Sequence, residues 1–195
     1  MAEFDLNTYW NAETGEHLDV AAKTFEALKD DFICMLDLCA ASVSNGGKIL
    51  FFGNGGSAAD AQHLATELSV RYSQDRAPIA ALALTTDTSV LTAAGNDLGF
   101  DHIFARQIEA LGNAGDVAIG ISTSGRSENV LKALKAAQKK GIHTIGLSGR
   151  DGGKMGDVCD VLLVVPSDTT ARIQEMHITI GQMLCGALEQ KLGLV

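Results

Sequence analysis

The sequence predicts an α/β fold: a three-layer sandwich in which a doubly wound parallel sheet of about five strands lies between helices. Short apolar runs that suit buried strands alternate with longer segments of helical periodicity along most of the chain. Polar segments rich in glycine or hydroxyl groups follow two of the apolar runs, as loops at the carboxyl edge of a parallel sheet do. The 195 residues contain no repeat, linker or low-complexity segment. We therefore expect an N-terminal arm over residues 1–17, loose or in contact with another subunit, and one domain over residues 18–195.

The composition excludes several classes of protein. Hydrophobic residues make up 46% of the chain, which is typical of a globular domain. No apolar run reaches the length of a membrane helix, and the polar, acidic N-terminus does not resemble a secretory signal. The net charge of −9 argues against binding to nucleic acid or to an anionic membrane. The 4 cysteines lack metal-site spacing, so we expect buried, reduced thiols in a cytosolic protein.

Each strand is expected where a short apolar run is bounded by polar or turn-forming residues. The expected strands are residues 48–52, 79–84, 116–121, 142–147 and 161–165. The first contains the run ILFF over residues 49–52, which suits a strand that is buried on both faces.

The first helix is expected over residues 18–44, because apolar residues such as Val20, Phe25 and Leu28 fall near one stripe. The turn Asn45-Gly46-Gly47 should end it. The other helices are expected over residues 57–72, from the possible caps at 85–89 to about 94, and over 101–111, 128–140 and 171–191. Residues 95–97 are expected to form a turn.

A glycine turn after the first strand predicts an anion site. The segment Gly53-Asn54-Gly55-Gly56 breaks the strand, and Ser57 is well placed to cap the helix that follows. Glycines let a ligand approach the backbone closely, and the free N–H groups of a helix N-terminus favour negative charge. Such turns are common, so this feature alone is weak support for a ligand.

A second loop strengthens the prediction of a phosphorylated ligand. Ser122, Thr123, Ser124, Gly125 and Ser127 follow the third expected strand and precede a helix. The alternative is that Ser127 only caps its helix and the other hydroxyls satisfy backbone groups. Two such loops at one sheet edge make a phosphorylated ligand the better interpretation.

Two helices carry polar residues that can face this edge. His63 and Glu67 are four residues apart, so they share a face of the helix that leads out of the glycine turn. Gln174 and Gln182 lie eight residues apart on the last helix, so they can also face one site. His177 should point elsewhere and make a structural hydrogen bond. The last helix is apolar on more than one side, which suits burial between subunits.

With these residues in view, the chain resembles the phosphoheptose isomerases, a family of the sugar-isomerase (SIS) domain superfamily. The resemblance covers nearly the whole chain after the arm. It rests on five motifs in the expected order: GNGGSAADAQH, LTTDTSVLTAAGND, GISTSGRSENVLKA, GLSGRDGGKM and RIQEMH.

The resemblance implies an SIS fold, which is a flavodoxin-like doubly wound sheet, in a cytoplasmic homotetramer with active sites between subunits. It implies isomerisation of sedoheptulose 7-phosphate to D-glycero-D-manno-heptose 7-phosphate, the first step towards the heptose of lipopolysaccharide or capsule. Glu67 matches the catalytic carboxylate, and His63, Glu67 and Gln174 match three zinc ligands. The implied substrate contacts are Asn54, Gly55, Gly56, Ser57, Glu67, Asn96, Asp97, Ser122, Thr123, Ser124, Ser127 and Gln174.

Gln182 is where the chain departs from the family, whose members usually have a histidine at this position as the fourth zinc ligand and as the partner of the catalytic carboxylate. An amide is a poorer zinc ligand than imidazole and does not act as an acid or base near neutral pH. The expected activity is therefore a slow isomerase with weak zinc or none. One alternative is a non-catalytic SIS tetramer that binds a replication initiator protein, as does a close relative in the superfamily that also lacks this histidine. The other is a sugar-phosphate sensor. Glu67 favours the enzyme.

Overall fold

A parallel, five-stranded sheet forms the centre of the computed structural model, which describes residues 4–195. Its strand order is β2-β1-β3-β4-β5, so the sheet is doubly wound as predicted. The strands are β1 (Ile49–Gly53), β2 (Ala81–Ala83), β3 (Val117–Ile121), β4 (His143–Gly149) and β5 (Val161–Val165). Every expected strand is present, with ends within two residues of the expected ones.

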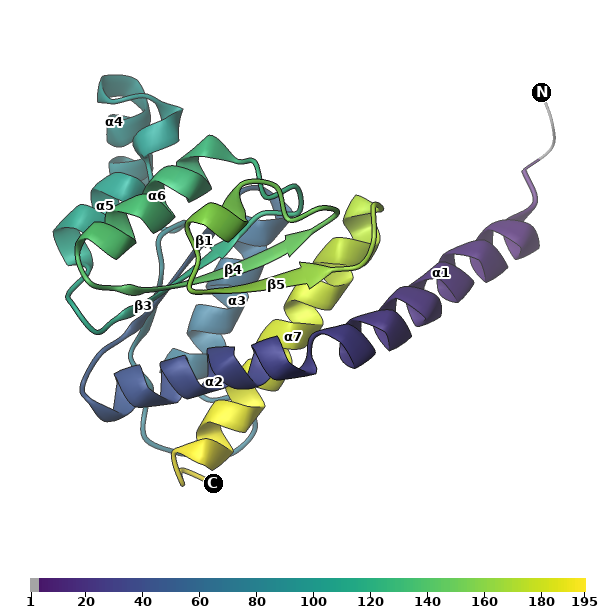
Figure 1. Cartoon of the computed structure of the whole chain (residues 1–195), viewed down its shortest axis with the longest axis horizontal. Coiled ribbons are helices and arrows are strands. Elements are labelled where there is room, and N and C mark those ends of the chain that lie inside the picture. Colours follow the sequence, from purple (N-terminus) through teal and green to yellow (C-terminus); the bar gives the residue numbers. More distant parts are fainter. Residues whose placement is uncertain (1–3) are drawn as a thin grey trace.

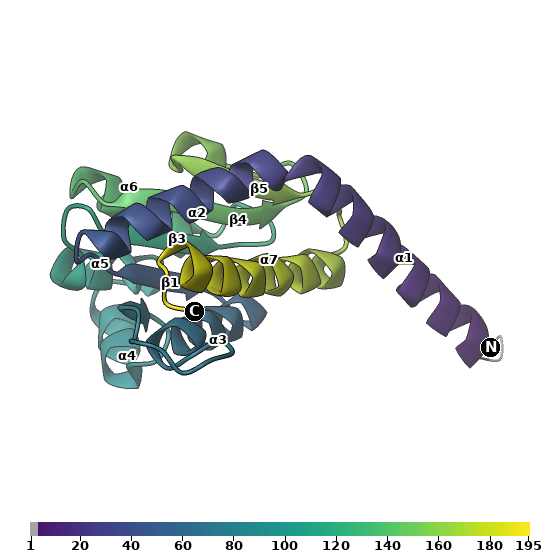
Figure 2. The ribbon, with the colours of Figure 1, turned by 90° about the horizontal axis from the view of Figure 1, so that it is seen from below.

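Helices cover both faces of the sheet, as expected of a three-layer sandwich (Figures 1 and 2). The helices are α1 (Leu6–Ala27), α2 (Lys29–Ser44), α3 (Gly56–Ser69), α4 (Thr88–Asp97), α5 (Ala105–Leu111), α6 (Glu128–Lys139) and α7 (Thr170–Lys191). Short 3-10 turns lie at Phe100–His102 and Met155–Asp157.

Two hydrophobic cores lie on opposite sides of the sheet. Ile49 and Phe51 of β1 point into the core that α2, α3 and α7 cover, while Leu50 and Phe52 point into the core under α5 and α6. Alternate residues of a strand face opposite ways, so β1 is buried on both faces as its sequence predicts.

The N-terminal segment differs from the expectation of a single helix after a loose arm. A helix begins at Leu6, where the Asp5 side chain accepts a hydrogen bond from the Asn7 N–H and so caps it. The expected helix over 18–44 is broken at Leu28, which ends α1 and precedes α2. α1 projects from the body of the protein as a long arm (Figures 1 and 2).

Three smaller expectations were wrong. Gly55, with a φ of 57°, is the N-cap of α3 in place of Ser57, which is the second residue of the helix. The expected turn at residues 95–97 is the last part of α4, which is capped by Asp87 as expected but continues to Asp97. Cys34 is exposed, whereas Cys39 and Cys185 are buried.

The sheet order brings the two polar loops together. β1 and β3 are neighbours, with Gly53 paired to Ile121 at their carboxyl ends. The glycine turn follows Gly53 and the hydroxyl-rich loop follows Ile121, so both lie where the strand order reverses, the usual ligand position in such sheets. Within residues 4–195, no helix is both long and apolar enough to cross a bilayer.

Candidate functional site

The two predicted anion loops are tied together by a pair of amides. Asn54 of the glycine turn donates to the Asn129 side chain at 2.9 Å, and Asn129 donates back to Asn54 at 2.8 Å. Asn129 lies in the first turn of α6 and is 2% exposed. This reciprocal pair fixes the glycine turn against the start of α6, so Asn54, Gly55, Gly56 and Ser57 lie beside the second loop.

Hydroxyl groups of the second loop face one another. The Oγ atoms of Ser122 and Ser127 are 3.0 Å apart, and the Ser124 Oγ accepts from the Arg126 N–H at 3.2 Å. Ser127 is the N-cap residue of α6 but makes no side-chain capping bond. Its hydroxyl therefore belongs to the loop, and the interpretation of Ser127 as a simple side-chain cap is wrong.

The glycine-rich loop after β4 packs directly against this hydroxyl-rich loop. Gly125 has a φ of 62°, and a Cβ there would lie 2.0 Å from the Gly152 carbonyl oxygen. A Cβ on Gly153 would likewise meet the Gly125 carbonyl oxygen at 2.4 Å. The Lys154 N–H also donates to this carbonyl at 2.8 Å. Only glycines allow the two loops to pack this closely, which explains why the GLSGRDGGKM segment has glycine at residue 153.

His63, Glu67 and Gln182 converge between α3 and α7. The His63 Nε2 lies 3.1 Å from the Glu67 Oε1 and 3.3 Å from the Gln182 Nε2. The i,i+4 spacing on α3 produces the first contact, as predicted. The His63 side chain is 45% exposed and that of Glu67 is 22% exposed, so the cluster is open on one side.

Gln174 faces the start of α3. A Cβ on Gly56 would lie 2.6 Å from the Gln174 Nε2, so the amide lies directly over the first turn of this helix. Gln174 and Gln182 thus both face α3, as expected, with Gln182 farther along the helix beside His63. The two glutamines and the α3 residues form one polar strip from the glycine turn to Glu67.

The donor set of this strip suits a cation, although a weakly bound one. One imidazole nitrogen cannot accept a proton from Gln182 and donate one to Glu67 at once. If the Gln182 amide were rotated by half a turn, its oxygen would face His63. The His63 Nε2, the Glu67 Oε1 and the Gln182 oxygen could then all offer lone pairs to one cation. Zinc prefers imidazole, carboxylate and thiolate to amide oxygen. Among the described residues, no three His, Cys, Asp or Glu side chains gather in this way, because both partners on α7 are glutamines.

Sequence reasoning missed Asp60, which lies on the same strip. Asp60 follows Gly56 by four residues and precedes His63 by three, so the three share a helix face. Its Oδ2 is buried without a hydrogen-bond partner. Burial raises the pKa of this carboxyl group, and the neighbouring His63 opposes the increase. The spacing of Asp60 from Gly56 and His63 could have revealed it, whereas no local pattern pairs Asn54 with Asn129.

Two predicted substrate contacts stay apart from this cluster. The Asn96 Nδ2 donates to the Asp97 Oδ1 at 2.7 Å, and both residues are exposed at the end of α4. Across residues 4–195, no hydrogen bond joins this pair to either loop. Their role as substrate contacts therefore stays a prediction.

His177 has the structural role that the sequence predicts. It is fully buried, and its Nε2 donates to the Ser148 carbonyl oxygen at 2.9 Å. Burial lowers the pKa of the imidazole to about 4, although the bond to Ser148 opposes this. His177 is therefore neutral at pH 7 and points away from Gln182.

The chain is similar in sequence to known proteins. The sequence pattern of the SIS domain matches residues 15–149. The phosphoheptose isomerase of Paramagnetospirillum magneticum is 57% identical over 182 residues, which cover 93% of this chain and 95% of the relative. The phosphoheptose isomerase of Campylobacter jejuni serotype O:6 is 54% identical over 178 residues, which cover 91% of this chain and 95% of the relative.

Solved structures give the same result. The structure of a phosphoheptose isomerase from Neisseria gonorrhoeae matches with a TM-score of 0.90 and 46% identity, covering 95% of this chain and 100% of that one. The Francisella tularensis phosphoheptose isomerase matches with a TM-score of 0.93 and 36% identity, covering 96% and 100% of the two chains. Other matches, such as an RpiR transcription factor domain from Sphaerobacter thermophilus at 16% identity, show the fold alone.

Proposed function

The chain belongs to the SIS-domain family and, within it, to the phosphoheptose isomerases, and from this premise we propose how its residues carry out the reaction. It is an isomerase that interconverts sedoheptulose 7-phosphate and D-glycero-D-manno-heptose 7-phosphate. The assignment of roles to residues rests on one observation. Glu67, His63 and Gln182 cluster on helices that lead away from two adjoining anion loops.

The phosphate is assigned to the two loops. Ser57, Ser122, Ser124 and Ser127 supply hydroxyl groups, and the backbone of Gly55, Gly56 and Thr123 supplies N–H groups. The Asn54–Asn129 pair and the contact between Ser122 and Ser127 support this assignment, because they hold both loops in one place. Asn96 and Asp97 remain assigned to the substrate through the family resemblance.

Glu67 is assigned as the base. Isomerisation moves a proton between C1 and C2 of the sugar through an enediol, which requires a base over the carbon and a group that stabilises the developing oxyanion. Glu67 removes a proton from C1 of the ketose and returns it to C2, while the proton of the C1 hydroxyl passes to the C2 oxygen through water. Gln182 orients the sugar oxygens by hydrogen bonding but donates no proton near neutral pH, so turnover is slow compared with that of relatives with a histidine.

Zinc is assigned to His63, Glu67 and Gln174, with Gln182 as a poor fourth ligand; Gln174 is assigned through the family resemblance, since its amide lies over Gly56 at the start of α3. The convergence of His63, Glu67 and Gln182 within 3.3 Å supports a cation site, and the two amides support weak affinity. When bound, the metal would polarise the sugar oxygens. Titration of the purified protein with zinc against a chelator measures this affinity without reference to activity.

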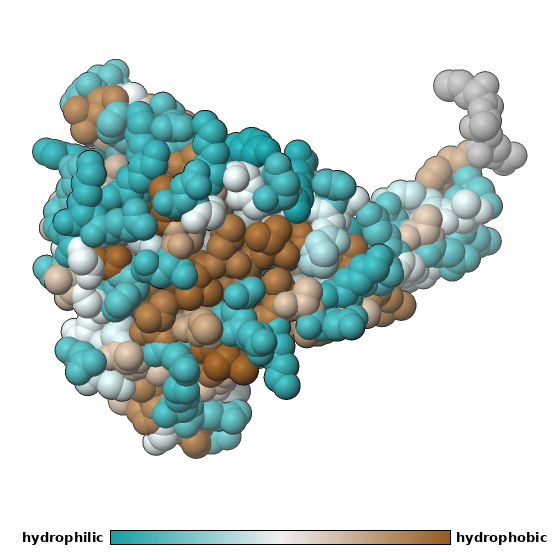
Figure 3. Space-filling view, in the orientation of Figure 1, coloured by the Kyte–Doolittle hydropathy of each residue, from teal (hydrophilic) through white to brown (hydrophobic). Residues whose placement is uncertain are grey.

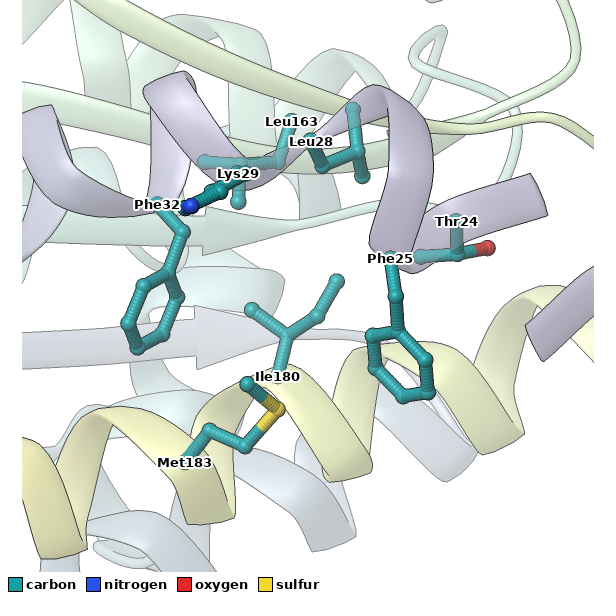
Figure 4. Close-up of a pocket in the computed structure, with 8 residues that line it drawn as sticks. All are labelled: Thr24, Phe25, Leu28, Lys29, Phe32, Leu163, Ile180 and Met183. Atoms are coloured by element: carbon teal, nitrogen blue, oxygen red, sulfur yellow. The ribbon is translucent and has the colours of Figure 1, made fainter. Parts of the chain in front are cut away.

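We also propose a homotetramer with active sites between subunits. An apolar groove of about 160 Å³ runs between α1, α2, β5 and α7, lined by Phe25, Phe32, Leu163, Ile180 and Met183 among others (Figure 4). Figure 3 shows apolar surface gathered over these elements. Phe25 is 47% exposed, and Trp10 on the projecting α1 is 65% exposed. Burial of these side chains by a second copy would explain both the groove and the arm.

We place the protein in the cytoplasm, where its product would supply heptose for lipopolysaccharide or capsule. A non-catalytic tetramer that binds an initiator protein is not favoured. The chain matches relatives named phosphoheptose isomerase over almost their whole length. A sugar-phosphate sensor would bind the heptose phosphate without converting it.

A coupled isomerase assay with sedoheptulose 7-phosphate tests the proposal. Glu67→Gln should lower kcat at least about a hundredfold, the usual contribution of a general base. Binding of the sugar phosphate should survive, because the anion loops are unchanged. Glu109→Gln, an exposed carboxylate on α5 across the sheet, is the matched control and should keep full activity. Equal activity of the Glu67 variant and the wild type would overturn its assignment as the base, and an inactive wild type that binds the sugar phosphate would favour the sensor.

A further inference from the structure

A buried ion pair joins the two helices that carry the site. The Arg76 Nε donates to the Glu189 Oε1 at 2.7 Å, and the side chains are 0% and 1% exposed. Arg76 lies in the loop between α3 and β2, and Glu189 lies near the C-terminal end of α7. Neither residue has a role in the reaction as described so far.

Arg76 caps the C-terminal end of α3, where Glu67, the proposed base, lies. Its Nη2 donates to the backbone carbonyl of Glu67 at 2.8 Å, and its Nη1 donates to the carbonyl of Leu68 at 2.7 Å. These carbonyls belong to the last turn of the helix, where intrahelical donors run out. The guanidinium therefore holds the backbone of Glu67 itself, through a charged group that water does not reach.

Glu189 connects this cap to α7. Its Oε1 accepts from the backbone N–H of Tyr72 at 3.0 Å as well as from Arg76. Glu189 follows Gln182 by seven residues, or two turns, so both lie on the face of α7 that packs against α3. The pair thus links the end of α3, where Glu67 lies, to the helix that carries Gln182.

Two further contacts show how close the helices are at this point. A Cβ on Gly181 would lie 2.5 Å from Leu64, so α3 and α7 touch beside His63. Cys185 lies between the site and the ion pair. Burial raises the pKa of its thiol to about 12, and the nearby Glu67 and Glu189 carboxylates add to this increase. The Cys185 thiol therefore lies within electrostatic range of both Glu67 and Glu189.

A buried ion pair is in general a weak source of stability, because desolvation offsets its attraction. We propose that Arg76 and Glu189 are positioning residues for the isomerisation: they fix the backbone of Glu67 and the register of α3 against α7. The inference rests on the proposed function, since it takes Glu67 as the base. A small displacement of a reacting group can cost up to about a hundredfold in rate.

The test compares the wild type with the double variant Arg76→Met/Glu189→Met. This change removes both buried charges and keeps similar side-chain volumes, so stability in urea should stay close to that of the wild type. The bonds to the Glu67 and Leu68 carbonyls are lost. The expected result is a fall in kcat of about tenfold or more, with KM for the sugar phosphate nearly unchanged because the anion loops are distant from the ion pair.

Two companion variants make the result decisive. Lys191→Met/Asp37→Met removes an exposed ion pair that joins α7 to α2 and should leave kcat and stability unchanged. Arg76→Lys keeps the buried charge, but one ammonium cannot reproduce the fork of bonds to two carbonyls and a carboxylate, so kcat should fall although the pair remains. This variant gives the same test if the double methionine variant does not fold.

The results of these experiments distinguish a failure of the positioning role from a failure of the proposed isomerase function. Full kcat in a folded double variant, or in Arg76→Lys, overturns the positioning role while leaving the function intact. A loss of kcat in strict proportion to a loss of folded protein also overturns it, since that result describes stability alone. A wild type without isomerase activity overturns the proposed function and this inference together.

Discussion

Acid should destabilise the protein through His177, a residue that takes no part in the reaction. The imidazole is fully buried, and burial lowers its pKa from 6.5 to about 4. The unfolded chain therefore binds a proton near pH 6.5, while the folded chain does not until about pH 4. Stability is fully present above pH 6.5 and is lost as the pH falls through this window. A separation of about 2.5 pH units corresponds to about 3 kcal/mol at 1.36 kcal/mol per unit.

The variant His177→Gln tests this reasoning, because glutamine has an N–H that can donate but no proton that titrates in the window. Urea unfolding of both proteins is measured at several pH values from 7 to 4, at one protein concentration because assembly would contribute to stability. We expect the variant to be less stable at pH 7, where it packs less well, but to lose about 3 kcal/mol less than the wild type on acidification. Parallel stability curves would refute the assignment of acid sensitivity to His177.

Three further predictions concern the strip between α3 and α7. Gln182→His should raise zinc affinity about tenfold or more, as measured by competition with a chelator, and equal affinities would contradict the proposed ligand set. Asp60→Asn should raise the melting temperature at pH 7, because the raised pKa of Asp60 means that its ionised form opposes folding; the gain should vanish below about pH 4, where unfolded and folded carboxyls are both protonated. Gly181→Ala should lower the urea midpoint by forcing a Cβ against Leu64, at a cost of about 1–3 kcal/mol. An unchanged midpoint would show that the helices can separate freely.

The sheet could be predicted from the sequence because its strands are short, apolar and buried on both faces. The edge where the two loops meet followed from the parallel order alone, and the contact between His63 and Glu67 followed from helical spacing. The break at Leu28 could not be predicted, since neither glycine nor proline marks it. The helical start of the arm was missed because Asp5 was not recognised as a cap.

The site was predicted less completely than the fold, because its remaining contacts join residues distant in sequence. Asn54 and Asn129 are 75 positions apart, and Arg76 and Glu189 are 113 apart. No local sequence pattern indicates such pairs. Asp60 was missed for another reason: a lone aspartate on a helix usually faces water, although its spacing places it on the face of Gly56 and His63, and its Oδ2 is buried.

The close packing of Gly125 against Gly152 has a consequence for how fast and how tightly an anion binds. The hydroxyl-rich loop is already held in shape by its neighbour, so its ordering entropy is lost when the chain folds and not when the ligand arrives. A phosphate ester should then meet a rigid receptor, with little conformational rearrangement to slow the encounter. The two loops are also coupled in their tolerance of mutation, since a side chain added to Gly125 would displace Gly152, and one added to Gly153 would displace Gly125.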